Sequence, residues 1–149
     1  MSIELTLERA QRIVDAGVAN ATRLHAAGVA VAIAVVDAGA HLVAFARMDD
    51  AFIGAIDLAT RKAGTSARFR VPSASLGALS AGDGPIRTIE HSNGGLVTFG
   101  GGLPLVGAHG RCVGAVGVSG GTVDDDEAIA RACIDAFATL LNAGQGART

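Results

Sequence analysis

The sequence predicts an α+β domain, a five-stranded antiparallel sheet flanked by helices, in the order α-β-β-α-(α)-β-β-β-α. Two observations support this class. Apolar residues recur at helical spacing near both ends of the chain, as they do on the buried face of an amphipathic helix. Between them lie two groups of short apolar runs separated by glycine-containing turns, which is typical of antiparallel strands joined by hairpins. Strands and helices grouped in this way favour α+β over a parallel α/β sheet.

The first helix is expected between Thr6 and Gly28. The Thr6 hydroxyl can accept a hydrogen bond from a free amide of the first turn, and Gly28 readily adopts the left-handed conformation that ends many helices. Residues 29–36 form an uninterrupted apolar run of strand length, which indicates a central strand covered on both faces. Residues 37–40 predict a hairpin turn, and residues 41–48 return as the second strand.

Residues 51–69 repeat the helical pattern, and Pro72 ends it, because the residue before a proline is disfavoured in helical conformation. The connection over residues 73–90 is less regular. We expect one or two short helical turns there, and this is the region where we expect a mobile loop.

Glycine-rich runs predict three more strands, at residues 96–99, 103–106 and 111–119. Acidic residues crowd the start of the last helix, where the helix dipole favours anions, namely Asp124, Asp125, Asp126 and Glu127. We expect this helix to extend to residue 141 and residues 142–149 to form a frayed tail. No linker or internal repeat divides the chain, so residues 1–149 are expected to form one domain.

The composition excludes several functional classes. The chain has 149 residues, 50% of them apolar, but no Trp or Tyr, so its core must consist mainly of Ala, Val, Ile and Leu. A net charge of −2 provides no field that would hold nucleic acid, and no apolar run is long enough to span a membrane. The charged N-terminus lacks a secretory signal, so we expect a cytoplasmic protein. Cys112 and Cys133 lie in apolar patterns and are expected to be reduced core thiols.

Four stretches resemble the GlcG/HbpS family, whose relatives include the C-terminal domain of PduO-type proteins. They are VVDAGAHLVAFARMDDA (35–51), KAGTSARF (62–69), FGGGLPL (99–105) and GAVGVSGGTVDDDEAIARA (114–132). The GGGxP and GVSGG stretches, in this order and spacing, are the specific part. The resemblance implies a five-stranded antiparallel sheet flanked by helices, assembly into oligomers and, as in some members, haem binding.

Four cations fall within ten residues of this slightly acidic chain: Arg61, Lys62, Arg68 and Arg70. Such side chains can clamp a carboxylate, for example a haem propionate or a small organic acid. The alternative is a solvated helix face with ion pairs. Arg47 and Lys62 match family positions, so these two are the predicted ligand-binding cations.

Gly100, Gly101 and Gly102 can present backbone N–H groups to an anion, or they can serve only turn geometry and close packing. Glu90 and His91 are the predicted catalytic residues, because a loop histidine beside a carboxylate can act as a general base or bind a metal or haem iron. The four histidines show no metal-ligand spacing, so we expect no metal site. They are His25, His41, His91 and His109.

Three functions stay open at this stage. The first is a protein that binds haem or another carboxylate-bearing ligand. The second is a cofactor-independent hydrolase, lyase or isomerase acting on a small organic acid, with Arg47 or Lys62 as the clamp, residues 100–102 as an oxyanion site and Glu90 or His91 as acid or base. The third is a structural or regulatory oligomer. For each we expect a homo-oligomer, and for the first two an anionic small-molecule ligand.

Overall fold

The computed structural model describes residues 3–24 and 28–146. Within these residues, four α-helices and a four-stranded sheet form, which confirms the α+β class. The elements are α1 (Leu7–Leu24), β1 (Ala32–Asp37), β2 (Leu42–Arg47), α2 (Gly54–Phe69), α3 (Ser73–Ser80), the 3₁₀ turn η2 (Ile89–His91), β3 (Gly102–Val106), β4 (Cys112–Ser119) and α4 (Val123–Gly146).

The strands are ordered β2-β1-β4-β3, and every neighbouring pair is antiparallel. Strand β1 is paired on both edges, with β2 and β4, and its residues Ala32–Val36 are fully buried. This confirms the prediction of a central strand covered on both faces. The hairpin that joins β1 to β2 also forms where it was expected, with the amide of Ala40 bonded to the carbonyl of Asp37 at 2.9 Å.

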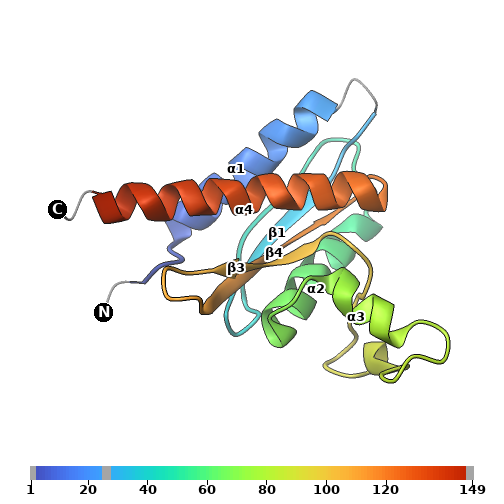
Figure 1. Ribbon diagram of the computed structural model, residues 1–149. Helices are drawn as coiled ribbons and strands as arrows, with labels where there is room; N and C mark the ends of the chain where they lie inside the picture. Colours follow the sequence, from blue (N-terminus) through green and yellow to red (C-terminus); the bar gives the residue numbers. More distant parts are fainter. Residues whose placement is uncertain (1–2, 25–27, 147–149) are drawn as a thin grey trace.

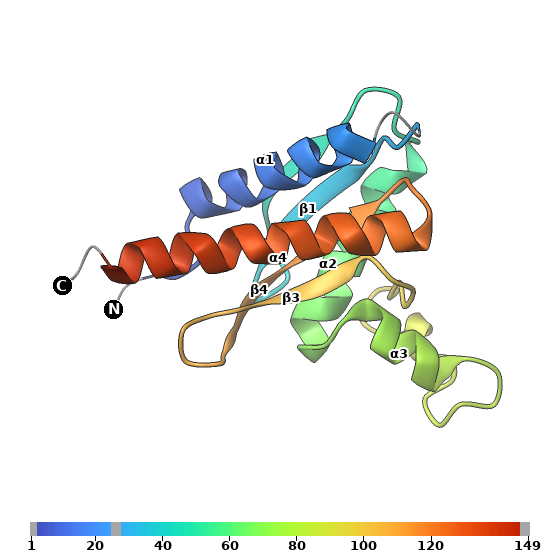
Figure 2. The same cartoon turned by 45° about the horizontal axis from the view of Figure 1, so that its top comes forward.

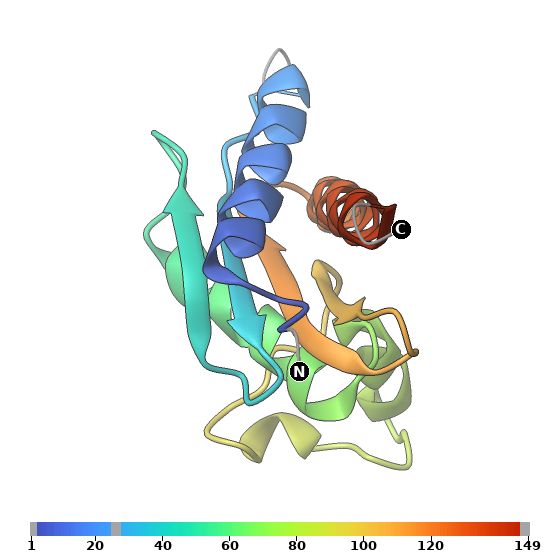
Figure 3. The same cartoon turned by 90° about the vertical axis from the view of Figure 1, so that its left-hand side faces the viewer.

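Helices cover both faces of the sheet and create two separate apolar cores. Helices α1 and α4 lie together over one face (Figure 2), and α2 lies against the opposite face (Figure 3). On the α1/α4 side, Ile33 and Val35 of β1 pack with larger side chains such as Phe137. On the α2 side the core consists almost entirely of alanine, from both the helix and the strands. Helix α3 and the segment after it project from the body (Figure 1).

The predicted strand at residues 96–99 does not form, so the prediction of five strands, and of three strands after the middle helices, was wrong. The backbone of this segment bonds helix side chains instead of another strand. The hydroxyl of Thr65 donates to the Val97 carbonyl at 3.0 Å, and that of Ser73 donates to the Phe99 carbonyl at 2.7 Å. These bonds hold the segment against α2 and α3.

The remaining differences concern the ends and the connection. Thr6 caps α1 as predicted, because the amide of Arg9 donates to its hydroxyl at 3.1 Å. The connection after Pro72 contains α3 and η2, in agreement with one or two short helical turns. Helix α4 continues to Gly146, so residues 142–146 are helical where we expected a frayed tail. Within the described residues, no helix is long and apolar enough to cross a membrane.

Two glycines on neighbouring strands allow α2 to approach the sheet closely. Gly102 of β3 and Gly117 of β4 face each other in the ladder. A Cβ atom on Gly117 would overlap the carbonyl of Ala59, and one on Gly102 would overlap the carbonyl of Lys62. The α2 backbone therefore packs directly on the backbone of both strands, which only glycine permits.

Gly117→Ala should consequently destabilise the fold by about 1–3 kcal/mol, because α2 must shift away from the sheet to admit one methyl group. Urea unfolding followed by circular dichroism measures the effect, since the chain has no Trp. Gly54→Ala is the matched control, because a Cβ there meets nothing within 4 Å. Equal unfolding midpoints for the two variants would contradict the close packing of α2.

Candidate functional site

Lys62 is the largest fully buried side chain among the described residues, with 0% of its surface exposed. Its Nζ donates to the Val118 carbonyl at 2.9 Å and to Asp126 Oδ2 at 3.1 Å. The ring centroid of Phe99 lies 4.8 Å from the same nitrogen, a cation–π contact. The ammonium group is thus enclosed by a carbonyl, a carboxylate and an aromatic face. In this conformation Lys62 does not reach solvent, so its predicted role in ligand binding stays a prediction.

The glycine run at residues 100–102 encloses this lysine. Gly101 has a φ of 122°, and a Cβ there would come within 2.9 Å of Lys62 Nζ. The Gly101 carbonyl accepts the Val118 amide at 2.9 Å, whereas the Val118 carbonyl accepts Lys62. In a regular antiparallel pair, the Val118 carbonyl would accept the amide of Gly101. Here Lys62 takes that acceptor. At least part of the function of these glycines is to make room for Lys62.

Asp126 is the anionic partner, and it is also buried. It lies in the first turn of α4, where its Oδ1 accepts the amide of Gly121 at 2.9 Å while Oδ2 faces Lys62. Next to it, Thr122 and Asp125 exchange backbone and side-chain hydrogen bonds at 3.1 and 3.2 Å, an N-terminal capping box. The sequence indicated an acidic helix start, but no signal in it distinguished Asp126 from its exposed neighbour Asp124.

Burial and pairing act in opposite directions on this ion pair. Burial lowers the pKa of the Lys62 ammonium below its ordinary value, and the nearby Asp126 carboxylate opposes this shift. Burial likewise raises the pKa of Asp126, and Lys62 and the Gly121 amide oppose that shift. Each charge is therefore tolerated in the interior because the other is present.

An open groove of about 800 Å³ lies on the other side of Phe99. We call it the α3 groove, because residues of α3 line it together with Phe99 and Gly100. Helix α3 fits closely there, since a Cβ on Gly77 would overlap the carbonyl of Thr98. The lining residues are Ala74, Gly77, Ser80, Ala81, Gly82, Arg87, Thr88, Glu90, Thr98, Phe99 and Gly100.

The groove brings together some of the predicted site residues and leaves out others. Glu90 and Gly100 line it. His91 is exposed in η2 and is not among the lining residues. Arg47 ends β2, at the sheet edge opposite to β3, and is therefore far from the groove. Sequence reasoning missed Arg87, an isolated arginine in an irregular segment that carries no recognisable signal.

Arg61, one of the four clustered cations, has a positioning role. Its Nε donates to Asp57 on the same helix at 2.8 Å, and its Nη1 donates to the carbonyls of Gly94 and Gly95 at 2.6 and 2.8 Å. The amide of Leu96 in turn donates to the Glu90 carbonyl at 2.9 Å. Arg61 thus ties the turn after η2 to α2 and so fixes the segment that carries Glu90.

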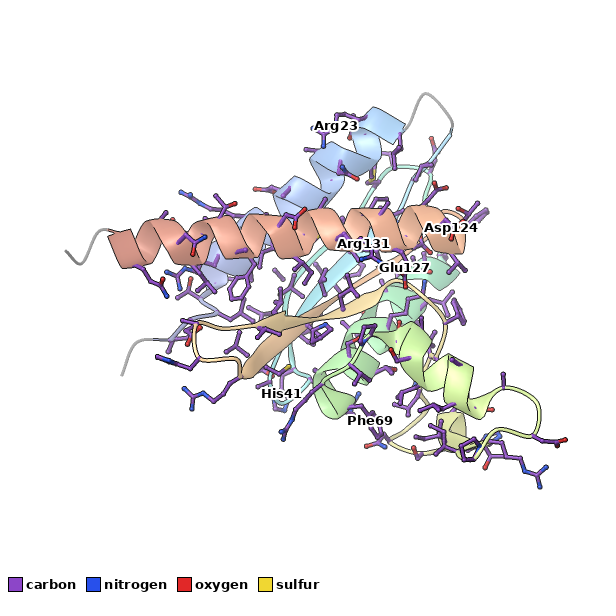
Figure 4. All side chains as sticks on the ribbon, viewed as in Figure 1. Arg23, His41, Phe69, Asp124, Glu127 and Arg131 are labelled. Carbon is purple, nitrogen blue, oxygen red and sulfur yellow. The ribbon has the colours of Figure 1, made fainter. Side chains whose placement is uncertain are left out.

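Metal binding has no support in the described residues, where no group of three or more His, Cys, Asp or Glu side chains converges. His25 lies outside the described residues. On α4, Glu127 and Arg131 lie one turn apart and pair at 3.3 Å (Figure 4). Glu127 also lies beside Gly100, at the end of the groove wall.

Comparison with known proteins places residues 5–135 in the family model described as haem degrading protein HbpS-like. A 15.0 kDa protein encoded between dhaT and dhaS of Citrobacter freundii is 34% identical over 137 residues, which cover 91% of this chain and 94% of that protein. The corrinoid adenosyltransferase PduO of Citrobacter freundii is 32% identical, but the chain spans only 40% of its length.

Two solved structures show the same fold at similar identity. Klebsiella pneumoniae protein ORFY superposes with a TM-score of 0.85 at 32% identity, over 90% of each chain. The haem complex of PduOC superposes with a TM-score of 0.81 at 31% identity, over 89% of this chain and 94% of that one. Both likenesses extend over nearly the whole domain.

Lys62→Met should destabilise the protein by about 3–5 kcal/mol at neutral pH, because it leaves Asp126 buried without its cation. The pKa of Asp126, already raised by burial, then rises further. Above pH 4 the folded state retains a proton that the unfolded state has lost, so the free energy of unfolding falls as pH rises. The deficit relative to the unmodified protein should be smallest in acid, as measured by urea unfolding between pH 4 and 10.

Asp126→Asn should show the opposite trend. It leaves Lys62 buried without an anion, so the pKa of the lysine falls further below its ordinary value. The unfolded state then binds the extra proton, and the deficit should shrink as pH rises towards 10. Deficits with the same pH dependence in both variants would show that the two groups are not held as a charged pair.

Proposed function

Because the chain belongs to the HbpS-like family, we propose that it is a small-ligand-binding protein and that its ligand is haem, bound in the α3 groove. The observation that carries the proposal is the likeness to PduOC, which was solved as a haem complex. The identity of 31% over nearly the whole domain supports a common type of ligand. When bound, haem would supply iron-centred redox chemistry, in line with the haem degradation by which the family is described.

The dimensions and lining of the groove support this ligand. Its volume of about 800 Å³ is within the range of about 300–1,000 Å³ typical of small-molecule sites. The Phe99 side chain, 46% exposed, offers apolar surface to a porphyrin plane. The guanidinium of Arg87 is available for a propionate, because its nearest carboxylate, Asp83, is 3.9 Å away and both side chains are largely exposed.

The axial position is where the fit is incomplete. Haem iron is usually held by His, Cys, Met or Tyr, and none of these lines the groove. The polar side chains that do are Glu90 and the hydroxyl groups of Ser80, Thr88 and Thr98. His91, the ligand suggested by the sequence, is next to the groove but does not line it. We therefore propose that the chain holds the macrocycle and the propionates, without a strong axial bond of its own.

Titration with haemin and with metal-free protoporphyrin IX tests this proposal. Both should give saturable shifts of the porphyrin absorption band, with dissociation constants that agree within about threefold, because iron adds little to binding. Arg87→Gln should weaken both by about five- to tenfold through the loss of a charge-assisted hydrogen bond. Arg12→Gln is the control, because Arg12 is an exposed arginine on α1 that pairs with Glu8 on the same helix.

The variant His91→Ala distinguishes haem binding with an axial histidine from binding without one. If His91 does not ligate iron, the variant binds haemin as the unmodified protein does. The contrary result is a haemin affinity far above the porphyrin affinity that disappears in His91→Ala. It would establish His91 as the axial ligand and contradict binding without an axial bond. Absence of saturation with either compound would refute haem binding in the groove.

An enzyme acting on a small organic acid is less well supported. Of the groups that such a site would combine, Glu90 and Gly100 line the groove. The two predicted clamps do not, because Lys62 is buried behind Phe99 and Arg47 lies at the far edge of the sheet. The proposal of a binding protein requires fewer rearrangements of the described structure.

Self-association is part of the same proposal. An exposed apolar patch precedes and begins α2, formed by Phe52, Ile53 and Ile56, of which the first two are 74% and 78% exposed. Exposed apolar patches mark interaction surfaces in soluble domains. We propose that this patch packs against a second copy of the chain.

The double variant Phe52→Ser/Ile53→Ser should accordingly lower the assembly state, because it removes most of the apolar surface of the patch. Size-exclusion chromatography with light scattering measures the mass directly. Leu79→Ser removes a 49% exposed leucine on α3, outside this patch, and serves as the control. A monomeric unmodified protein, or an unchanged mass in the double variant, would contradict this assignment.

A further inference from the structure

A second pocket, distinct from the α3 groove, lies where the end of α2 meets the β1–β2 and β3–β4 turns. It has a volume of about 390 Å³ and is lined by Arg70, Arg111 and Cys112, with Ala67 and Val106 among its apolar residues. The two sites lie at opposite ends of β3, since Gly100 precedes the strand and Val106 ends it. Figure 4 marks this end of the molecule by Phe69 of α2 and His41 after the β1–β2 turn.

Two arginines from distant parts of the sequence line this pocket. Arg70 follows α2, and Arg111 precedes β4. Within residues 3–24 and 28–146, neither side chain forms an ion pair or a hydrogen bond. Two cations that line one pocket repel each other, so an anion bound between them would stabilise the arrangement.

The backbone at Arg70 is a second, independent observation. Arg70 ends α2 in the left-handed conformation, with φ 58° and ψ 33°, and its amide donates to the Ser66 carbonyl at 2.8 Å. Glycine is the residue preferred at such a position, because a side chain is disfavoured there. Arginine at this position carries a conformational cost that glycine would avoid, and a use of its side chain in the pocket would account for that cost.

The remaining charge near the pocket limits the ligand. Asp37 and Glu4 line an adjoining pocket together with Arg111 and Cys112. The Asp37 carboxylate accepts the amides of Gly39 and His41 at 2.9 Å, and the Glu4 carboxylate accepts the amide of Ala108 at 2.8 Å, so each is held at a turn. Two guanidinium groups beside two carboxylates leave no excess of positive charge, which suits a singly charged carboxylate better than a doubly charged phosphate.

We propose that this pocket binds a small monocarboxylic acid. Arg70 and Arg111 donate to its carboxylate, since the planar guanidinium matches carboxylate geometry, and its short hydrocarbon part lies on Ala67 and Val106. The assignment is independent of haem binding, because none of these residues lines the α3 groove.

Cys112 provides a direct reporter of occupancy. Cys112 lines the pocket and is partly exposed, and its thiol donates to the Gly114 carbonyl at 3.2 Å. The other cysteine, Cys133, is buried, and burial raises its pKa to about 12, so it should not react in the folded protein. Alkylation by neutral iodoacetamide, followed by mass spectrometry, therefore reports on Cys112 alone.

The experiment measures this alkylation rate in the full chain with acetate, butyrate or inorganic phosphate, with chloride keeping the ionic strength constant. Butyrate should slow alkylation at least fivefold, and the effect should saturate. Its half-protecting concentration should be about five- to tenfold lower than that of acetate, because two more methylene groups contact the apolar wall. Arg70→Gln and Arg111→Gln should each raise the half-protecting concentration about tenfold. Arg68→Gln should leave it unchanged, since that guanidinium lies over Gly64.

Three results would overturn the proposal. Protection that does not saturate, or that persists unchanged in Arg70→Gln and Arg111→Gln, would exclude this site. Stronger protection by phosphate than by either acid would assign the pocket to an inorganic anion. In Arg70→Gly, butyrate should no longer protect Cys112 from alkylation. The melting temperature of this variant should nevertheless rise by about 2–4 °C, because glycine accepts the left-handed backbone. A lower melting temperature would show that Arg70 is retained for stability.

Discussion

The contact between the backbone of α2 and the backbone of β3 and β4 determines most of what is unusual in this domain. It depends on the facing glycines Gly102 and Gly117, which leave no side chain between helix and sheet. At this separation only small side chains fit, which is why the core on this side is almost entirely alanine. An alanine core buries little apolar area per residue, so α2 gains less from hydrophobic burial than α1 or α4 does.

The Lys62–Asp126 pair is a consequence of this close packing. With the sheet backbone so near, Lys62 Nζ reaches the Val118 carbonyl and the first turn of α4, which lies on the other face of the sheet. One side chain thereby connects α2, the end of β4 and the start of α4. The ring of Phe99 covers the ammonium and at the same time lines the α3 groove. The groove wall is therefore held by the same interaction that ties the two helical layers together.

Local patterns predicted the elements that are stabilised locally. The cap at Thr6, the apolar run of β1, the hairpin after it and the acidic start of α4 were all recognised, because each depends on residues a few positions apart. The predicted strand at 96–99 failed because its carbonyls bond Thr65 and Ser73, which are distant in sequence. The burial of Lys62 was missed for the same reason, since its partners are 56 and 64 positions away. No periodicity in the sequence reports such contacts.

The four cations of residues 61–70 show why a charged cluster in a sequence need not be one in space. Successive residues of a helix point about 100° apart, so each of these side chains meets a different part of the fold. Arg61 holds the turn at Gly94 and Gly95, and Lys62 is enclosed in the core. Arg68 lies along its own helix over Gly64. Of the four, Arg70 alone lies beyond the helix end and lines a pocket with a second cation. That cation is Arg111, 41 positions further along the chain. The clustered cations therefore do not form one common surface, because each of them has a different environment in the fold.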